Sequence, residues 1–178
     1  TMNAHFGSAG HLLKRLFFSA LPTKKSNASD ALLSLLNSKE LSLFNAQKRI
    51  DKNHSFRNVK KLIASSETTP APDLLVACAL HDVGKIQSRF GLTGRVLATC
   101  VASVVGLRRI DTWSRKSPKS LSHRIAVYVR HPEIGANLLM EAQSNRIAIV
   151  WARDHHKRLD ESTLDPSLFI ILSEADRA

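Results

Sequence analysis

The scarcity of glycine and proline constrains the fold of this chain more than any other feature of its sequence. The 178 residues contain 7 glycines and 6 prolines, and the apolar residues recur with helical spacing. An all-β chain needs many tight turns, which use these two residues. Hydrophobic residues make up 43% of the chain, enough to bury a core and to disfavour disorder over most of its length. The sequence therefore predicts an all-α fold, a helical bundle with an N-terminal helical extension.

The chain divides into an extension over residues 1–44 and an organised helical domain over residues 45–178. We expect the extension to contain a flexible start, an amphipathic helix over 12–21, a polar linker over 22–27, a short helix that Ser29 or Asp30 caps and that ends at Leu36, and a further helical piece over 39–47. The segment 11–21 (HLLKRLFFSAL) either packs on the domain or makes peripheral contact with a membrane surface.

The domain is predicted to consist of helices separated by short breaks. The expected helices cover residues 48–65, 73 to about 84, 92–105, 120–129, 132–143, 145–155 and 166 to the C-terminus. We expect Val59, Leu62 and Ile63 on a buried face, Gly84 as a left-handed helix cap, and a loop over 107–120.

Charge and cysteine content limit the partners and the compartment. The net charge of +11 and the pI of about 10.2 favour an anionic partner, although scattered surface charge explains them equally well. Nucleic acid is disfavoured as the main partner, because few aromatic residues are available for stacking on bases. Cys78 and Cys100 both lie in apolar segments and are predicted to be buried thiols of a cytoplasmic protein.

Histidines and aspartates recur at the ends or on the apolar faces of the predicted helices. The set comprises His54, His81, Asp82, His131, His155, His156 and Asp176. The other three histidines, His5, His11 and His123, do not belong to this arrangement. An inward-facing carboxylate is costly unless a cation or hydrogen bonds compensate it. Mixed imidazole and carboxylate ligands suit Fe, Mn, Ni, Co or Zn, with Mg also admitted, and the lack of thiolates argues against a closed structural zinc site.

Two cationic side chains lie close to this set in the sequence. Lys85 follows Asp82 by three residues and is expected to meet a phosphate oxygen, although a solvated lysine at a helix end is the alternative. Arg57 follows His54 by about one turn and is a weaker candidate for the same role.

The ordered series resembles the HD-domain superfamily of metal-dependent phosphohydrolases. The matching segments within residues 45–178 are DKNHSFRNV, LLVACALHDVGKI, RHPEIGANLL, WARDHH and SEADRA, and the HDVGK and HPEIG segments look like the HDIG-type branch. The resemblance implies a core of at least five helices and one or two divalent metal ions. It implies that His54, His81, Asp82 and Asp176 hold one ion. Asp82 would then bridge to a second ion held by His131 and His155, with His156 as an additional or replacement ligand.

The resemblance implies hydrolysis of a phosphomonoester or phosphodiester, such as a nucleotide, by metal-activated water, with Asp82 and Lys85 in catalytic roles. The sequence after His156 lacks the glycine-tyrosine-proline element of the branch that cleaves cyclic di-GMP, and the HDVVED-type element of the alarmone hydrolases is absent as well. The alternative function is a non-catalytic regulatory or nucleotide-sensing module.

Overall fold

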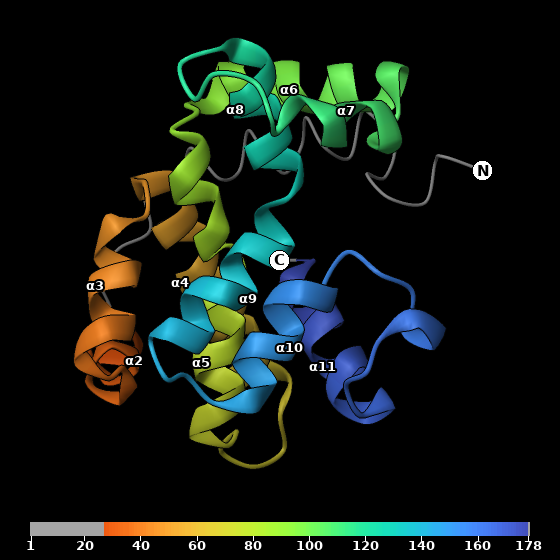
Figure 1. Cartoon of the computed structure of the whole chain (residues 1–178). Helices are drawn as coiled ribbons and strands as arrows, with labels where there is room; N and C mark the ends of the chain where they lie inside the picture. The colour runs from red at the N-terminus through yellow and green to blue at the C-terminus, as the bar shows by residue number, and fades with distance from the viewer. Residues whose placement is uncertain (1–26, 178) are drawn as a thin grey trace.

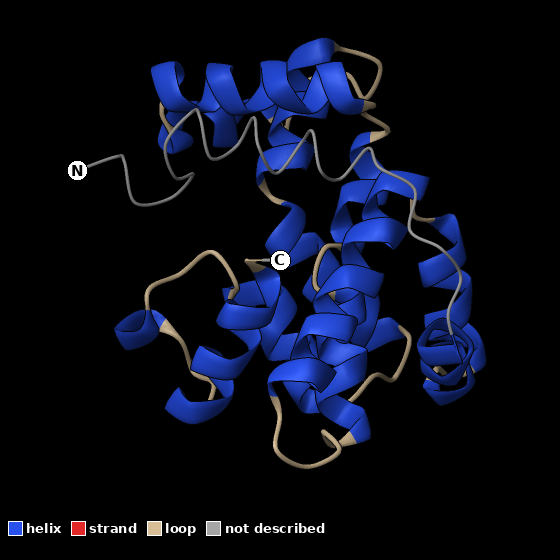
Figure 2. Ribbon diagram, turned by 180° about the vertical axis from the view of Figure 1, so that it is seen from behind, coloured by secondary structure: helices blue, strands red, loops and turns tan. Residues whose placement is uncertain are grey.

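The computed structural model describes residues 27–177, and every regular element in that range is a helix (Figures 1 and 2). The all-α prediction is therefore confirmed for this part of the chain. The elements are α2 (Asn27–Leu35), α3 (Ser38–Ala46), α4 (Arg49–Ser65), α5 (Pro72–Leu80), the 3₁₀-helix η2 (Val83–Ser88), α6 (Leu92–Val105), α7 (Leu107–Trp113), α8 (Leu121–Val129), α9 (His131–Glu141), α10 (Arg146–Asp154), the 3₁₀-helix η3 (Leu159–Glu161) and α11 (Pro166–Asp176).

The expectations for residues 1–26 lie outside the described residues. These are the flexible start, the helix over 12–21, the linker, the membrane contact of segment 11–21, and the placement of His5 and His11. Within residues 27–177, no helix combines the length and the apolar character needed to cross a bilayer.

Several helices start directly after a residue whose side chain caps the helix N-terminus. The side chains of Ser120 and Asn145 each accept a hydrogen bond from the backbone N–H three residues later, at the start of α8 and α10. The side chain of Asp165, the residue before Pro166, accepts one from Ser167 N at the start of α11. Asn37 forms a reciprocal capping box with Glu40 at the start of α3. The predicted caps at Ser29 and Asp30 are wrong, because α2 already begins at Asn27.

The described residues pack around two separate hydrophobic clusters. The larger cluster joins α2, α3, α4, α5, α9, α10 and α11 and includes Leu32, Phe44, Leu62, Leu80, Leu139, Trp151 and Leu172. The smaller cluster joins α6, α7 and α8, which lie together above the main bundle in Figure 1, and includes Phe90, Ala98, Ala102, Ile110, Ile125 and Ala126. Leu32 and Phe44 belong to the larger cluster, so α2 and α3 share a core with the helices that follow residue 45.

Several predictions within the domain are wrong, and one of them, the cap at Gly84, is described with the site. The helix expected over 73 to about 84 ends at Leu80, and η2 follows it. Residues 107–113 form helix α7 instead of a loop, because Ile110 is fully buried in the smaller cluster. Cys100 is exposed, since α6 buries only the face with Arg95, Ala98 and Ala102. Ile63 is 42% exposed, because the buried face of α4 is centred on Asn58 and Leu62.

Candidate metal centre

The predicted ligands lie at or near helix ends that meet at one place in the fold. His81 directly follows α5, His155 directly follows α10, His131 opens α9 and Asp176 closes α11. Only His54 lies within a long helix, one turn into α4. The remaining two members, Asp82 and His156, follow His81 and His155 in the sequence. The structure therefore brings together all seven residues of the predicted set, five of them from five different helices.

Three of these histidines are held in the same way. The Nδ1 atoms of His81, His131 and His155 each lie within hydrogen-bond distance of the backbone carbonyl three residues earlier, at 3.0, 2.7 and 2.9 Å. Those carbonyls belong to the last turns of α5, α8 and α10, where backbone carbonyls can accept hydrogen bonds from side chains. A carbonyl can only accept, so each Nδ1 carries the proton and donates. In its neutral form, each ring therefore presents a lone pair at Nε2.

His54, His81 and Asp176 form one of three groups with ligand-like spacing; a second is described next, and the third, His81, Asp82 and His155, joins the two. Asp176 Oδ1 lies 2.9 Å from His54 Nε2 and 3.1 Å from His81 Nε2. Asn58, one turn after His54 on α4, is fully buried, and its Nδ2 lies 3.1 Å from both His54 Nε2 and Asp176 Oδ1. Asn58 thus holds the orientation of this group, and sequence reasoning did not single it out.

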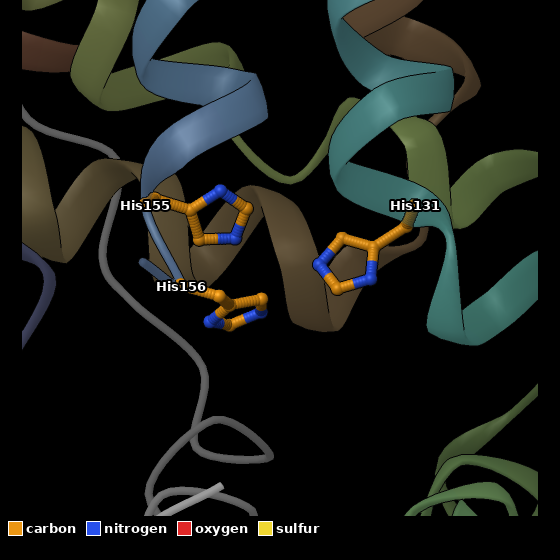
Figure 3. A group of neighbouring side chains, drawn as sticks. All are labelled: His131, His155 and His156. Carbon is orange, nitrogen blue, oxygen red and sulfur yellow. The ribbon is translucent and has the colours of Figure 1, made fainter. Parts of the chain in front are cut away.

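His131, His155 and His156 form the second group. Figure 3 shows the three rings converging, two from the end of α10 and one from the start of α9. The ring centroids of His155 and His156 are 4.0 Å apart, and that of His131 lies 5.4 Å from His155 and 5.1 Å from His156. The structure therefore places both members of the His155-His156 pair beside His131.

Asp82 lies between the two groups, with one carboxylate oxygen toward each. Its Oδ2 is 3.6 Å from His81 Nε2 and 4.0 Å from His54 Nε2. Its Oδ1 is 3.4 Å from His131 Nε2 and 3.5 Å from His155 Nε2. This is the arrangement that a bridging carboxylate requires.

Buried atoms without partners test whether the residues fit a cation. His81 Nε2, His131 Nε2, His155 Nε2 and Asp82 Oδ1 are all buried and make no hydrogen bond. Each is an electron-rich atom that faces other electron-rich atoms, an arrangement that is unfavourable unless a positive charge lies between them. Two donors on one ion at about 2.1 Å are themselves about 3.0–3.5 Å apart. Of the six separations, four lie between 2.9 and 3.5 Å, and the other two, from Asp82 Oδ2 to the histidines, are 3.6 and 4.0 Å. The residues therefore fit a divalent metal ion, with a small movement of Asp82 Oδ2.

The protonation states suit metal binding. Burial raises the pKa values of Asp82 and Asp176, but neighbouring cationic and histidine groups outweigh this effect and hold both pKa values well below their usual range. Burial lowers the pKa of His131 to about 4 and also lowers the pKa values of His54 and His156. For His81, the nearby carboxylates outweigh burial and raise the pKa. The site therefore offers ionised carboxylates and mainly neutral imidazoles at pH 7, the ligand forms that metals need.

Gly84 has a different role from the predicted helix cap. It lies inside η2, and it is not among the described residues with positive φ. A Cβ at Gly84 would lie 2.1 Å from His131 O and 2.6 Å from Gly135 N. Glycine is needed here because the backbones of η2 and α9 touch, and this contact sets the distance between Asp82 and His131.

The site opens into a cavity of about 560 Å³. Lys85, Arg95, Tyr128, Arg153 and Lys157 contribute to its lining. Lys85 is only 15% exposed at its side chain, and its Nζ lies 2.5 Å from Asp82 Oδ2, so it is not a solvated helix-end lysine. The other candidate, Arg57, does not line this cavity.

Sequence reasoning also overlooked Asp154, which precedes the His155-His156 pair. Its side chain is fully buried and accepts hydrogen bonds from Thr163 N at 3.1 Å, Ser162 Oγ at 3.1 Å and Arg153 Nε at 2.9 Å. Lys157 Nζ lies 2.7 Å from its Oδ1. Asp154 therefore ties the loop after α10 to the helix end that positions both histidines. The sequence feature that could have pointed to Asp154 is its position directly before two histidines.

No family model, curated protein or solved structure matches this chain.

Proposed function

We propose that this chain is a metal-dependent phosphohydrolase of the HD type, which hydrolyses a phosphomonoester or phosphodiester such as a nucleotide. The observation that carries the proposal is the convergence of four buried, unpartnered donor atoms on His81, Asp82, His131 and His155. When bound there, a divalent cation would polarise a phosphoryl oxygen and lower the pKa of water. A cytoplasmic location belongs to the same proposal, since Cys78 is a free buried thiol.

The chain's own residues would orient the reacting groups. Backbone carbonyls fix the rings of His81, His131 and His155, so their Nε2 atoms need no reorganisation when the cation binds. Asp82 contributes negative charge to both histidine groups. Lys85 is a buried cation at the same carboxylate, and Asp82 outweighs burial and raises its pKa, so the lysine keeps its charge for contact with a non-bridging phosphate oxygen.

The test measures metal content and phosphoester hydrolysis on the same samples. We expect the native protein to bind one or two divalent ions and to release p-nitrophenol from p-nitrophenyl phosphate or its bis-ester. Asp82→Ala and the isosteric Asp82→Asn remove the shared carboxylate, and both should lose metal and at least about 100-fold in turnover. Asp73→Ala, which removes an exposed aspartate from the first turn of α5, is the matched control.

The outcomes separate the proposal from its rival. A native protein that binds no divalent ion would refute the metal centre. Metal binding without turnover of mono- or diesters, including nucleotides, would instead favour the regulatory or nucleotide-sensing module. Full activity in Asp82→Asn with its metal intact would remove Asp82 from the mechanism.

A further inference from the structure

A buried ion pair lines the same cavity but does not belong to the metal centre. Arg95 on α6 and Asp51 on α4 form a two-pronged contact, with Nη1–Oδ1 at 2.5 Å and Nη2–Oδ2 at 2.6 Å. The two side chains are 6% and 5% exposed. Asp51 sits one turn before His54 on α4, so the pair lies next to the metal ligands and links the main bundle to the smaller cluster.

Stability alone is a poor explanation for this pair. A buried ion pair rarely stabilises a fold more than apolar side chains of the same size, because both charges lose their hydration. Arg95 also lies in the first turn of α6, where the helix dipole disfavours a cation. Its Nε is buried and has no hydrogen-bond partner. Arg95 as a whole lines the cavity, and a ligand oxygen that reached Nε would satisfy a donor that otherwise has no partner.

We propose that Arg95, held in place by Asp51, is an anion-binding residue that takes a non-bridging oxygen of the phosphate group in this cavity. The inference rests on the proposed function for its substrate class. Asp51 occupies the end of the guanidinium with both carboxylate oxygens, which leaves the edge containing Nε free to donate.

The neighbouring charges agree with this role. Lys85 and Tyr128 line the same cavity and offer a second cation and a phenol hydroxyl. Six acidic residues also line it, namely Asp51, Asp82, Asp111, Glu133, Glu161 and Asp176. Asp51 is already paired with Arg95, and Asp82 and Asp176 face the histidines. Three of the six acidic side chains are thus directed at Arg95 or at the histidines, and Arg95 and Lys85 are the cations of this cavity that lie beside the candidate metal ligands in α4 and at the start of η2. A phosphate that enters beside them would receive a charge-assisted hydrogen bond.

The experiment measures binding of inorganic phosphate to the full chain by calorimetry, with and without added divalent metal. A single substitution would leave an uncompensated buried charge, so the main variant replaces both partners, Asp51→Leu with Arg95→Met. The control applies the same changes to the exposed pair Arg158 and Asp160, as Arg158→Met with Asp160→Leu. We expect the Asp51/Arg95 double variant to raise the Kd for phosphate at least about tenfold, with metal content and melting temperature unchanged, and the control to bind as the native protein does.

Arg95→Lys keeps the charge and the pairing with Asp51 but removes the forked donor group. This variant replaces the double variant in the phosphate-binding measurement if the double variant fails to fold. It should also weaken phosphate binding, by a smaller factor. Unchanged phosphate affinity in either folded variant would overturn the inference, as would the absence of phosphate binding to the native protein. Because metal content is measured separately, a chain that binds metal but shows no role for Arg95 leaves the proposed function intact.

Discussion

At the scale of single residues, backbone carbonyls fix the tautomer of three histidines. His81, His131 and His155 donate from Nδ1 to a carbonyl three residues earlier, so their Nε2 lone pairs face the site before any ligand arrives. Residue types alone were sufficient to select the histidines and Asp82. They could not reveal Asn58 or Asp154, whose roles depend on hydrogen bonds to partners far away in the fold or in the next loop.

The first prediction concerns Asp154. Asp154→Asn keeps the shape but removes the charge that Arg153, Lys157 and Thr163 N stabilise, and it should lower the free energy of unfolding at pH 7 by about 1–3 kcal/mol. Burial raises the pKa of Asp154, but these partners outweigh it and hold the pKa below its usual value. The carboxylate's contribution is therefore present above the unfolded-state pKa of about 3.9 and is lost as the pH falls below it.

Urea unfolding of both proteins at pH 7 and at about pH 3 checks this sign. The stability difference between native protein and Asp154→Asn should shrink at the lower pH. A difference that is equal or larger in acid would contradict the role given to the charge. Asp73→Asn, an exposed aspartate, should show little difference at either pH.

At the scale of helices, the site is an assembly of helix ends. The boundaries of α4, α6, α8 and α11 agree within a residue or two with those expected from caps and periodicity. Sequence patterns failed where two backbones meet, because a glycine can be required by a turn or by a close contact. The sequence pattern predicted that Gly84 serves a turn at a helix end. In the structure it serves a close contact, because the backbone that it touches, at His131, lies nearly fifty residues later in the chain.

Gly84→Ala should therefore damage both the packing and the site. The added Cβ meets backbone atoms of α9 that cannot rotate away, so we expect a loss of about 1–3 kcal/mol in stability or more. The displacement of His131 from Asp82 should also weaken metal binding. Gly91→Ala is the control, because a Cβ there meets nothing within 4 Å. Chemical unfolding and metal titration measure the two effects. Equal behaviour of the two variants would contradict the close-contact explanation.

At the scale of the whole molecule, two cores meet around one cavity. The main bundle supplies the histidines and aspartates, and the smaller cluster of α6, α7 and α8 supplies Arg95 and Tyr128 to the same space. The candidate metal centre draws on α4, α5, α9, α10 and α11, so the full set of candidate ligands exists only when the bundle is folded. Metal binding should therefore be coupled to global stability.

A bound divalent ion should raise the melting temperature of the full chain. At about 100 times its Kd, a ligand specific for the folded state adds about 2.7 kcal/mol, equivalent to about 5–10 °C for a domain of this size. His131→Gln should reduce this shift. His123→Gln should preserve it, since His123 lies outside the cavity with its Nδ1 bonded to Ser114 O. Thermal melts with and without metal or chelator measure both. An equal shift in the two variants would exclude His131 as a ligand.

The sequence by itself determined the helical class, most helix boundaries, and the histidines and aspartates that the fold brings together, because these depend on local spacing and caps over a few residues. Only the tertiary structure decided which apolar face is buried, as Cys100 and Ile63 show, and that residues 107–113 form a helix. It also decided the partners of Asp82 and the pairing of Arg95 with Asp51. Those features depend on contacts between segments far apart in the chain, which local periodicity does not encode.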